Sequence, residues 1–135
     1  MKMPIGEIFD RYTIVKLKNE RLENGTEIVD QLELYENEIK KLIGKLSKRK
    51  QVVARQLLLE LTRINSIIWD LEKDLRDGFE NQLRLEEIGR TAIKIRNYNG
   101  FRVRAKNDLY DLFDQPIFRE IKINHISRTD EKTSG

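Results

Sequence analysis

Residues 57–75 read LLLELTRINSIIWDLEKDL, and the spacing of the apolar residues in this stretch predicts a helix. Leucine and isoleucine recur in steps of four, three, four, three and four, at positions 57, 61, 64, 68, 71 and 75. Such spacing places one apolar stripe along a helix, because neighbouring turns then present the same face. We therefore expect a helix over about residues 52–77 that packs along another helix.

A second stripe with the same steps comes earlier in the chain, at positions 28, 32, 35, 39, 42 and 46. The polar residues 47–51 between the two stripes are typical of a turn. Two matched stripes joined by a short loop predict an antiparallel helical hairpin. We expect an all-α fold, an antiparallel helical bundle built on this long hairpin of the second and third helices. Helices near residues 5–22 and from residue 81 would pack on it.

The end of the chain has a different pattern. Ile121, Ile123 and Ile126 approach a period of two, which predicts a short extended C-terminal segment. Residues 128–135 contain no apolar side chain and are expected to form a disordered tail. The predicted organisation is one helical domain over residues 1–127 followed by this tail.

The fourth helix contains an interrupted stripe. Apolar residues at positions 88, 92 and 95 define it, and at helical spacing it continues through Asn99, Arg102 and Lys106 before reaching Leu109. If the helix is continuous, these polar groups need partners, because burying an unpaired charge costs several kcal/mol. If Gly100 resets the phase, Arg102 is exposed instead. The sequence leaves both arrangements open.

The first helix offers acidic partners for these cations. Glu7 and Asp10 either face Arg102 and Lys106 across the bundle or belong to an ordinary charge ladder with Arg11. Arginine and asparagine side chains near the interrupted stripe are suited to donating hydrogen bonds to a phosphate or carboxylate. The candidate ligand-binding residues are Glu7, Asp10, Arg11, Arg96, Asn97, Asn99, Arg102 and Lys106.

Composition limits the chemistry. The 135 residues include no cysteine and one histidine, His125, so thiolate catalysis, disulfides and a multi-histidine metal site within one chain are excluded. Asp70 and Asp74 lie one turn apart, but they are too few to hold a cation through oxygen alone. We expect no cofactor and no metal. No transmembrane run or signal sequence is evident, so we expect a cytoplasmic protein without membrane contact.

Positive charge is concentrated in two blocks. Residues 39–59 carry seven basic side chains and no acid, and residues 88–107 carry six and no acid. Such segregation creates a local field that a net charge of +3 conceals. Tyr98 and Phe101, interleaved with arginines, leave nucleic-acid binding open. The acidic remainder of the chain would repel a long polyanion, so a compact anion fits better.

Three stretches resemble an uncharacterised family of small helical proteins of bacteria and tailed phages. They are GEIFDRYTIVKLK at residues 6–18, IWDLE at residues 68–72, and the arginine- and asparagine-rich stretch that continues to Leu112. The family pattern is basic at the positions of Asn107 and Asp108. The resemblance implies a helical fold and no established activity. It singles out Glu7, Asp10, Arg11, Trp69, Glu72, Asn99, Arg102 and Lys106.

The hypothesis favoured by the sequence is a non-enzymatic protein that holds a small phosphate-bearing, nucleotide-like anion. A phage accessory protein acting on a host nucleotide or factor, in the host cytoplasm, would fit. Three alternatives remain: a protein–protein adaptor that uses the helical stripes, a nucleic-acid-binding protein, and a nucleotide or sugar-nucleotide enzyme with Glu7, Asp10 or Glu72 as base. We expect a homodimer, because a thin bundle buries more surface by pairing. Arg102→Ala is expected to abolish binding and lower the Tm by no more than a few degrees.

Overall fold

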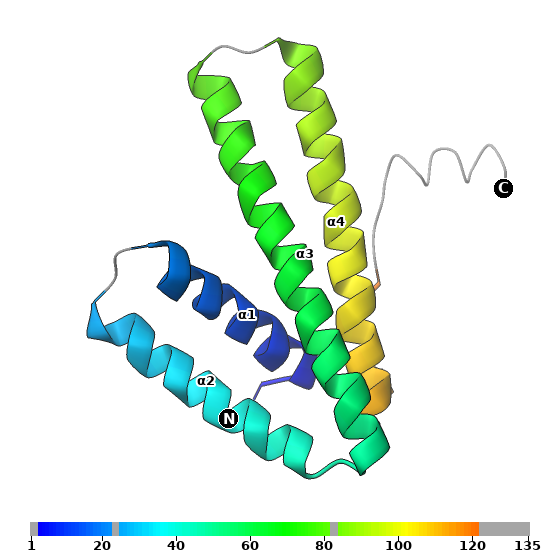
Figure 1. Ribbon diagram of the computed structural model, residues 1–135. Helices are drawn as coiled ribbons and strands as arrows, with labels where there is room; N and C mark the ends of the chain where they lie inside the picture. The colour runs from blue at the N-terminus through cyan, green and yellow to red at the C-terminus, as the bar shows by residue number, and fades with distance from the viewer. Residues whose placement is uncertain (1–2, 23–24, 82–83, 122–135) are drawn as a thin grey trace, which may run out of the picture.

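The protein is an all-α bundle in the computed structural model, which describes residues 3–22, 25–81 and 84–121 (Figure 1). The helices are α1 (Ile5–Arg21), α2 (Thr26–Gly44), α3 (Lys48–Glu80) and α4 (Leu85–Leu112), followed by the short 3₁₀ helix η1 (Pro116–Phe118). These ranges contain no strand, which confirms the predicted fold class. The expected extended segment beyond Ile121 and the tail at 128–135 lie outside the described residues.

The pairing of the helices differs from the sequence expectation. The long antiparallel hairpin is formed by α3 and α4, while α1 and α2 form a second, shorter hairpin (Figure 1). The helices α2 and α3 are joined by a short turn and then diverge, so their matched stripes do not meet along their length. The stripe of α3 instead faces α1 and α4, because α3 makes most of its interhelical contacts with these two helices.

The core lies where the four helices meet, at the end of the bundle that holds the α2–α3 turn. Phe9, Leu61 and Leu109 are fully buried there and come from three different helices. The apolar stripe of α3 contributes its first two-thirds to this core, and α2 contributes Ile39 and Ile43. The rest of α3 and α4 extends past α1 and α2 as a two-helix arm (Figure 1).

Local hydrogen bonds mark the start of α3 and the end of α4. The third helix begins at Lys48, earlier than expected, because the Ser47 hydroxyl caps it by accepting a hydrogen bond from the Lys50 backbone N–H. The fourth helix ends at Leu112, before Pro116. There Asp114 adopts φ 56°, and the backbone N–H of Gln115 donates to the Tyr110 carbonyl. This is the usual hydrogen-bond pattern of a helix C-terminus.

None of the described helices combines the length and apolar character needed to cross a membrane.

Candidate functional site

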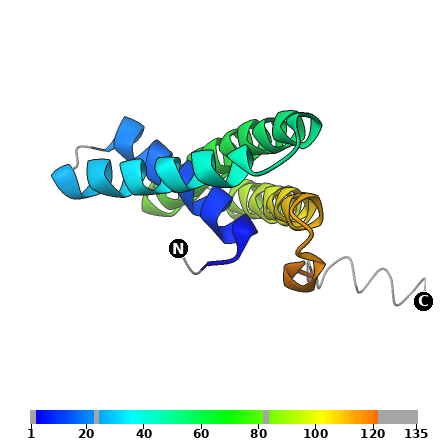
Figure 2. The same ribbon diagram turned by 90° about the horizontal axis from the view of Figure 1, so that it is seen from below.

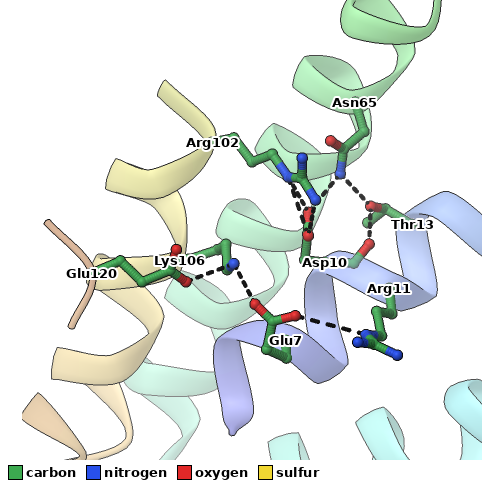
Figure 3. Close-up of polar contacts among 8 residues, drawn as sticks. All are labelled: Glu7, Asp10, Arg11, Thr13, Asn65, Arg102, Lys106 and Glu120. Carbon is green, nitrogen blue, oxygen red and sulfur yellow. Dashed lines mark hydrogen bonds and ion pairs between the residues drawn. The ribbon is translucent and has the colours of Figure 1, made fainter. Parts of the chain in front are cut away.

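The interrupted stripe of α4 is part of a continuous helix. The helix passes through Gly100 without a break, so Arg102 and Lys106 keep the phase of the apolar residues on either side. Both side chains point toward α1, where Asp10 and Glu7 meet them (Figure 3). Of the two arrangements left open by the sequence, the continuous helix with paired charges is therefore correct.

Asp10 is the most deeply buried charge of this site, with a side chain that is 2% exposed. Arg102 donates from Nε to both carboxylate oxygens, at 2.9 and 3.1 Å, and from an Nη nitrogen at 2.5 Å. Asn65 of α3 adds a hydrogen bond of 2.8 Å to the same carboxylate and a second one to the Thr13 hydroxyl. The free-energy cost of burying the Asp10 carboxylate is compensated because the carboxylate is paired with Arg102 and hydrogen-bonded. The hydrogen bond to Asp10 raises the pKa of Arg102.

Lys106 forms the second half of the site. Its side chain is 7% exposed, and Nζ lies 2.5 Å from a Glu7 oxygen and 2.6 Å from a Glu120 oxygen. The other Glu7 oxygen lies 3.7 Å from Nε of the exposed Arg11 (Figure 3). Lys106 therefore ties α1 and the segment after η1 to α4.

Asn107 holds the same segment by its backbone. Its side-chain amide donates to the Glu120 carbonyl at 2.8 Å, and its side-chain oxygen accepts from the Glu120 N–H at 2.6 Å. A lysine or arginine at this position has no acceptor for the second bond. Asn107 is thus the residue that pairs with the backbone of the chain after η1.

The charges of this polar cluster, defined as Glu7, Asp10, Arg11, Arg102, Lys106 and Glu120, balance at three acids and three bases. Two of the cations expected to bind a ligand, Arg102 and Lys106, already bind protein carboxylates. Two of the three acids suggested as general bases, Glu7 and Asp10, are engaged in the same pairs. The cluster joins three segments of the chain, and the Nε and one Nη nitrogen of Arg102 are already occupied by the Asp10 carboxylate.

A different side of α4 carries a cation without such a partner. A groove of about 390 Å³, the Arg96 groove, is lined by Ala92, Ile95, Arg96, Asn99, Gly100, Val103 and Ile121. The Nε atom of Arg96 is buried and makes no hydrogen bond in the described part of the chain. Buried polar atoms are nearly always hydrogen-bonded in folded proteins, so an unpaired guanidinium nitrogen requires an explanation.

The remaining candidates are spread over the surface. Asn97 is exposed and does not line the Arg96 groove. Tyr98 and Phe101 stack edge to face at 5.4 Å, with the Arg104 guanidinium 5.6 Å from the Phe101 ring. These side chains line a pocket between α3 and α4 that includes neither Arg96 nor Arg102, so the interleaved set suggested for nucleic acid does not form one site.

The resemblance also singled out two residues of α3. Trp69 packs against α1, where Arg21 lies 5.9 Å from the indole centroid and binds Asp70 at 2.9 Å. Glu72 is exposed and lies outside the polar cluster. Trp69 therefore serves the contact between α1 and α3, and Glu72 has no contact with the other singled-out residues.

Four residues of the site were missing from the sequence prediction: Thr13, Asn65, Asn107 and Glu120. Asn65 had a detectable signal, because it occupies an apolar stripe four positions after Leu61 and three before Ile68. Glu120 had none, since its place depends on how the chain returns after η1. Among the described residues, no group of three or more His, Asp or Glu side chains is placed to hold a metal ion.

No family model, no curated protein and no solved structure matches this chain.

Alkaline pH tests the Lys106 pairs. Burial lowers the pKa of Lys106, but the bonds to Glu120 and Glu7 outweigh burial, so the pKa lies above the ordinary 10.5. A raised pKa contributes stability below pH 10.5 that is lost as pH rises through the folded-state value. Burial also raises the pKa of Tyr110, so this group too contributes stability that is lost at high pH. We expect the free energy of unfolding, measured in urea between about pH 9 and pH 11.5, to fall less steeply in Lys106→Met than in the wild type. Equal slopes of the free energy of unfolding against pH in the two proteins would contradict a stabilising role of the Lys106 ion pairs.

Proposed function

We propose that this protein is a non-enzymatic binding protein for a small phosphate-bearing anion, and that the anion binds in the Arg96 groove. The observation that carries the proposal is the buried Nε of Arg96 without a hydrogen-bond partner. A guanidinium offers several N–H donors in a planar fork that matches phosphate oxygens. A bound phosphate would provide the missing acceptor.

The surroundings of Arg96 favour a small ligand. The volume of about 390 Å³ falls within the range of about 300–1,000 Å³ that small-molecule sites occupy. Asn99 adds a neutral donor and acceptor, and Ala92, Ile95 and Val103 offer an apolar surface for the rest of a nucleotide-like molecule. The polar cluster supports the site indirectly, since Arg102 and Lys106 hold α4 against α1.

Calorimetric titration with pyrophosphate and with ADP tests the proposal. We expect saturable binding to the wild type, and a loss of affinity of about tenfold or more in Arg96→Gln, because a charge-assisted hydrogen bond is lost. The matched control is Arg90→Gln, which removes the same charge from an exposed position of α4 whose side chain is 67% exposed. Equal binding by Arg96→Gln and wild type, or no heat with either anion, would contradict the proposal.

We also propose that the chain forms a homodimer through the two-helix arm. Phe79, Leu85 and Ile93 lie on the arm and are 62%, 84% and 46% exposed. Pairing of two arms would remove part of this exposed apolar surface from water. Sedimentation equilibrium should show a dimer for the wild type and a monomer for Phe79→Asp. A wild type that stays monomeric at all concentrations would refute the proposed homodimer.

A further inference from the structure

A second groove is lined by residues of α2 and α3, with one residue of α1. The helices α2 and α3 diverge from their turn, as Figures 1 and 2 show. Its volume is about 490 Å³, and it shares no lining residue with the Arg96 groove. It is lined by Tyr12, Glu36, Ile39, Lys40, Ile43, Gly44, Arg55 and Leu58. A ligand bound here would be a separate ligand, so this inference does not rest on the proposed function.

The groove combines an apolar floor with charged side chains. Ile39 and Ile43 belong to the buried core, and Leu58 packs against that core while remaining half-buried. Predominantly apolar lining with a few polar groups is the usual composition of small-molecule sites, where the polar groups fix orientation. Val52 and Leu59 of α3 are exposed, at 53% and 70%, and extend the apolar surface of α3 beyond the groove.

The charge at the groove favours an anion. Glu36 is its only acid, and it accepts a hydrogen bond from the Tyr12 hydroxyl at 3.5 Å and pairs with Lys40 at 3.6 Å. Arg55 forms no ion pair with a carboxylate among the described residues, and it donates a hydrogen bond to the Gln51 side chain at 3.3 Å. Seven basic residues and no acid lie between positions 39 and 59, which favours a positive local field near Arg55.

We propose that the α2–α3 groove binds an amphipathic anion. Its alkyl chain would lie on the floor formed by Ile39, Ile43 and Leu58, and its carboxylate or phosphate head would bind Arg55. A free fatty acid or alkyl phosphate and an anionic membrane lipid share this chemistry. The positive field steers the head group, and burial of the alkyl chain supplies the apolar contribution.

The test uses the full chain with labelled isoleucine and leucine methyl groups, followed by NMR. The probes are decanoate, decyl phosphate, butyrate, uncharged decyl maltoside, and vesicles of phosphatidylglycerol. We expect decanoate and decyl phosphate to shift the Ile39, Ile43 and Leu58 signals saturably, and butyrate and decyl maltoside to bind at least about tenfold more weakly. If only the vesicles shift these signals, the amphiphile is a membrane lipid and the proposal holds.

Two variants separate head-group recognition from general adhesion. Arg55→Glu should weaken decanoate binding about tenfold or more, since it replaces the attracting charge with a repelling one. Arg76→Glu makes the same charge change at an exposed position of α3 outside the groove and should bind like the wild type. Circular dichroism checks that both variants fold.

Four results would overturn the proposal. They are no shift with any probe, equal binding by Arg55→Glu and wild type, equal binding of decyl maltoside and decanoate, and tighter binding of an acidic amphipathic helical peptide at the same methyl groups. The last result would identify the groove as a docking site for a partner helix.

Discussion

Arg102→Ala should lower the free energy of unfolding by about 3–5 kcal/mol, the range found when one partner of a buried ion pair is removed. The reason is Asp10, whose side chain is 2% exposed and would keep only the Asn65 amide as a side-chain partner. The expected loss of Tm is on the order of 10 °C or more. This differs from the expectation from the sequence, which treated Arg102 as a ligand-binding residue with little effect on stability.

Two further variants make this prediction specific to the pair. Arg104→Ala removes an exposed arginine two positions away and should cost less than about 1 kcal/mol. The double change Asp10→Leu with Arg102→Met should recover part of the loss, because removing both charges leaves none buried and unpaired. Urea unfolding measures all three. A loss of less than about 1 kcal/mol in Arg102→Ala would mean that Asp10 reaches solvent.

Gly6→Ala should destabilise the protein by about 1–3 kcal/mol, the usual cost of forcing extra volume into a packed core. A Cβ atom at Gly6 would lie 2.6 Å from Cζ and 2.7 Å from the hydroxyl oxygen of Tyr110. Tyr110 is 2% exposed and packs on Phe118, so its ring has little room to move. The glycine that begins the first family-like motif is therefore required by the close approach of α1 to α4.

Gly89→Ala is the matched control, because a Cβ there would meet nothing within 4 Å. Alanine is the better helix former by about 1 kcal/mol, so this variant should be slightly more stable than the wild type. Combining Gly6→Ala with Tyr110→Leu should restore part of the lost stability by making room for the methyl group. Equal effects of alanine at Gly6 and Gly89, measured by thermal unfolding, would show that the Tyr110 contact is not tight.

The sequence predicted the helices because their apolar spacing is a local property. The stripe is buried as expected from Leu57 to Ile68, and the interrupted stripe led to the pairs of Arg102 with Asp10 and of Lys106 with Glu7. That inference was possible because a charge on an apolar line needs an opposite charge nearby. Glu7 and Asp10 lie on the helix whose own apolar residues face the core.

The partners of each helix could not be predicted in the same way. The stripes of α2 and α3 have equal spacing, so either could pack on any other apolar face. Local spacing does not specify that α2 pairs with α1 and α3 with α4. The burial of Arg96 was equally out of reach, because it depends on a groove that Ile121 lines after the chain turns at η1. Long-range arrangement therefore determined that the Nε atom of Arg96 is buried without a hydrogen bond in the described part of the chain.

We propose that the guanidinium of Arg96, rather than that of Arg102, donates hydrogen bonds to a bound phosphate. NMR of the arginine Nε–Hε groups tests it most directly, with signals assigned by Arg96→Lys and Arg102→Lys. Titration with pyrophosphate should shift the Arg96 signal saturably and leave the Arg102 signal in place, because Asp10 already accepts from Arg102. Movement of the Arg102 signal with an unchanged Arg96 signal, or no movement of either, would contradict the account.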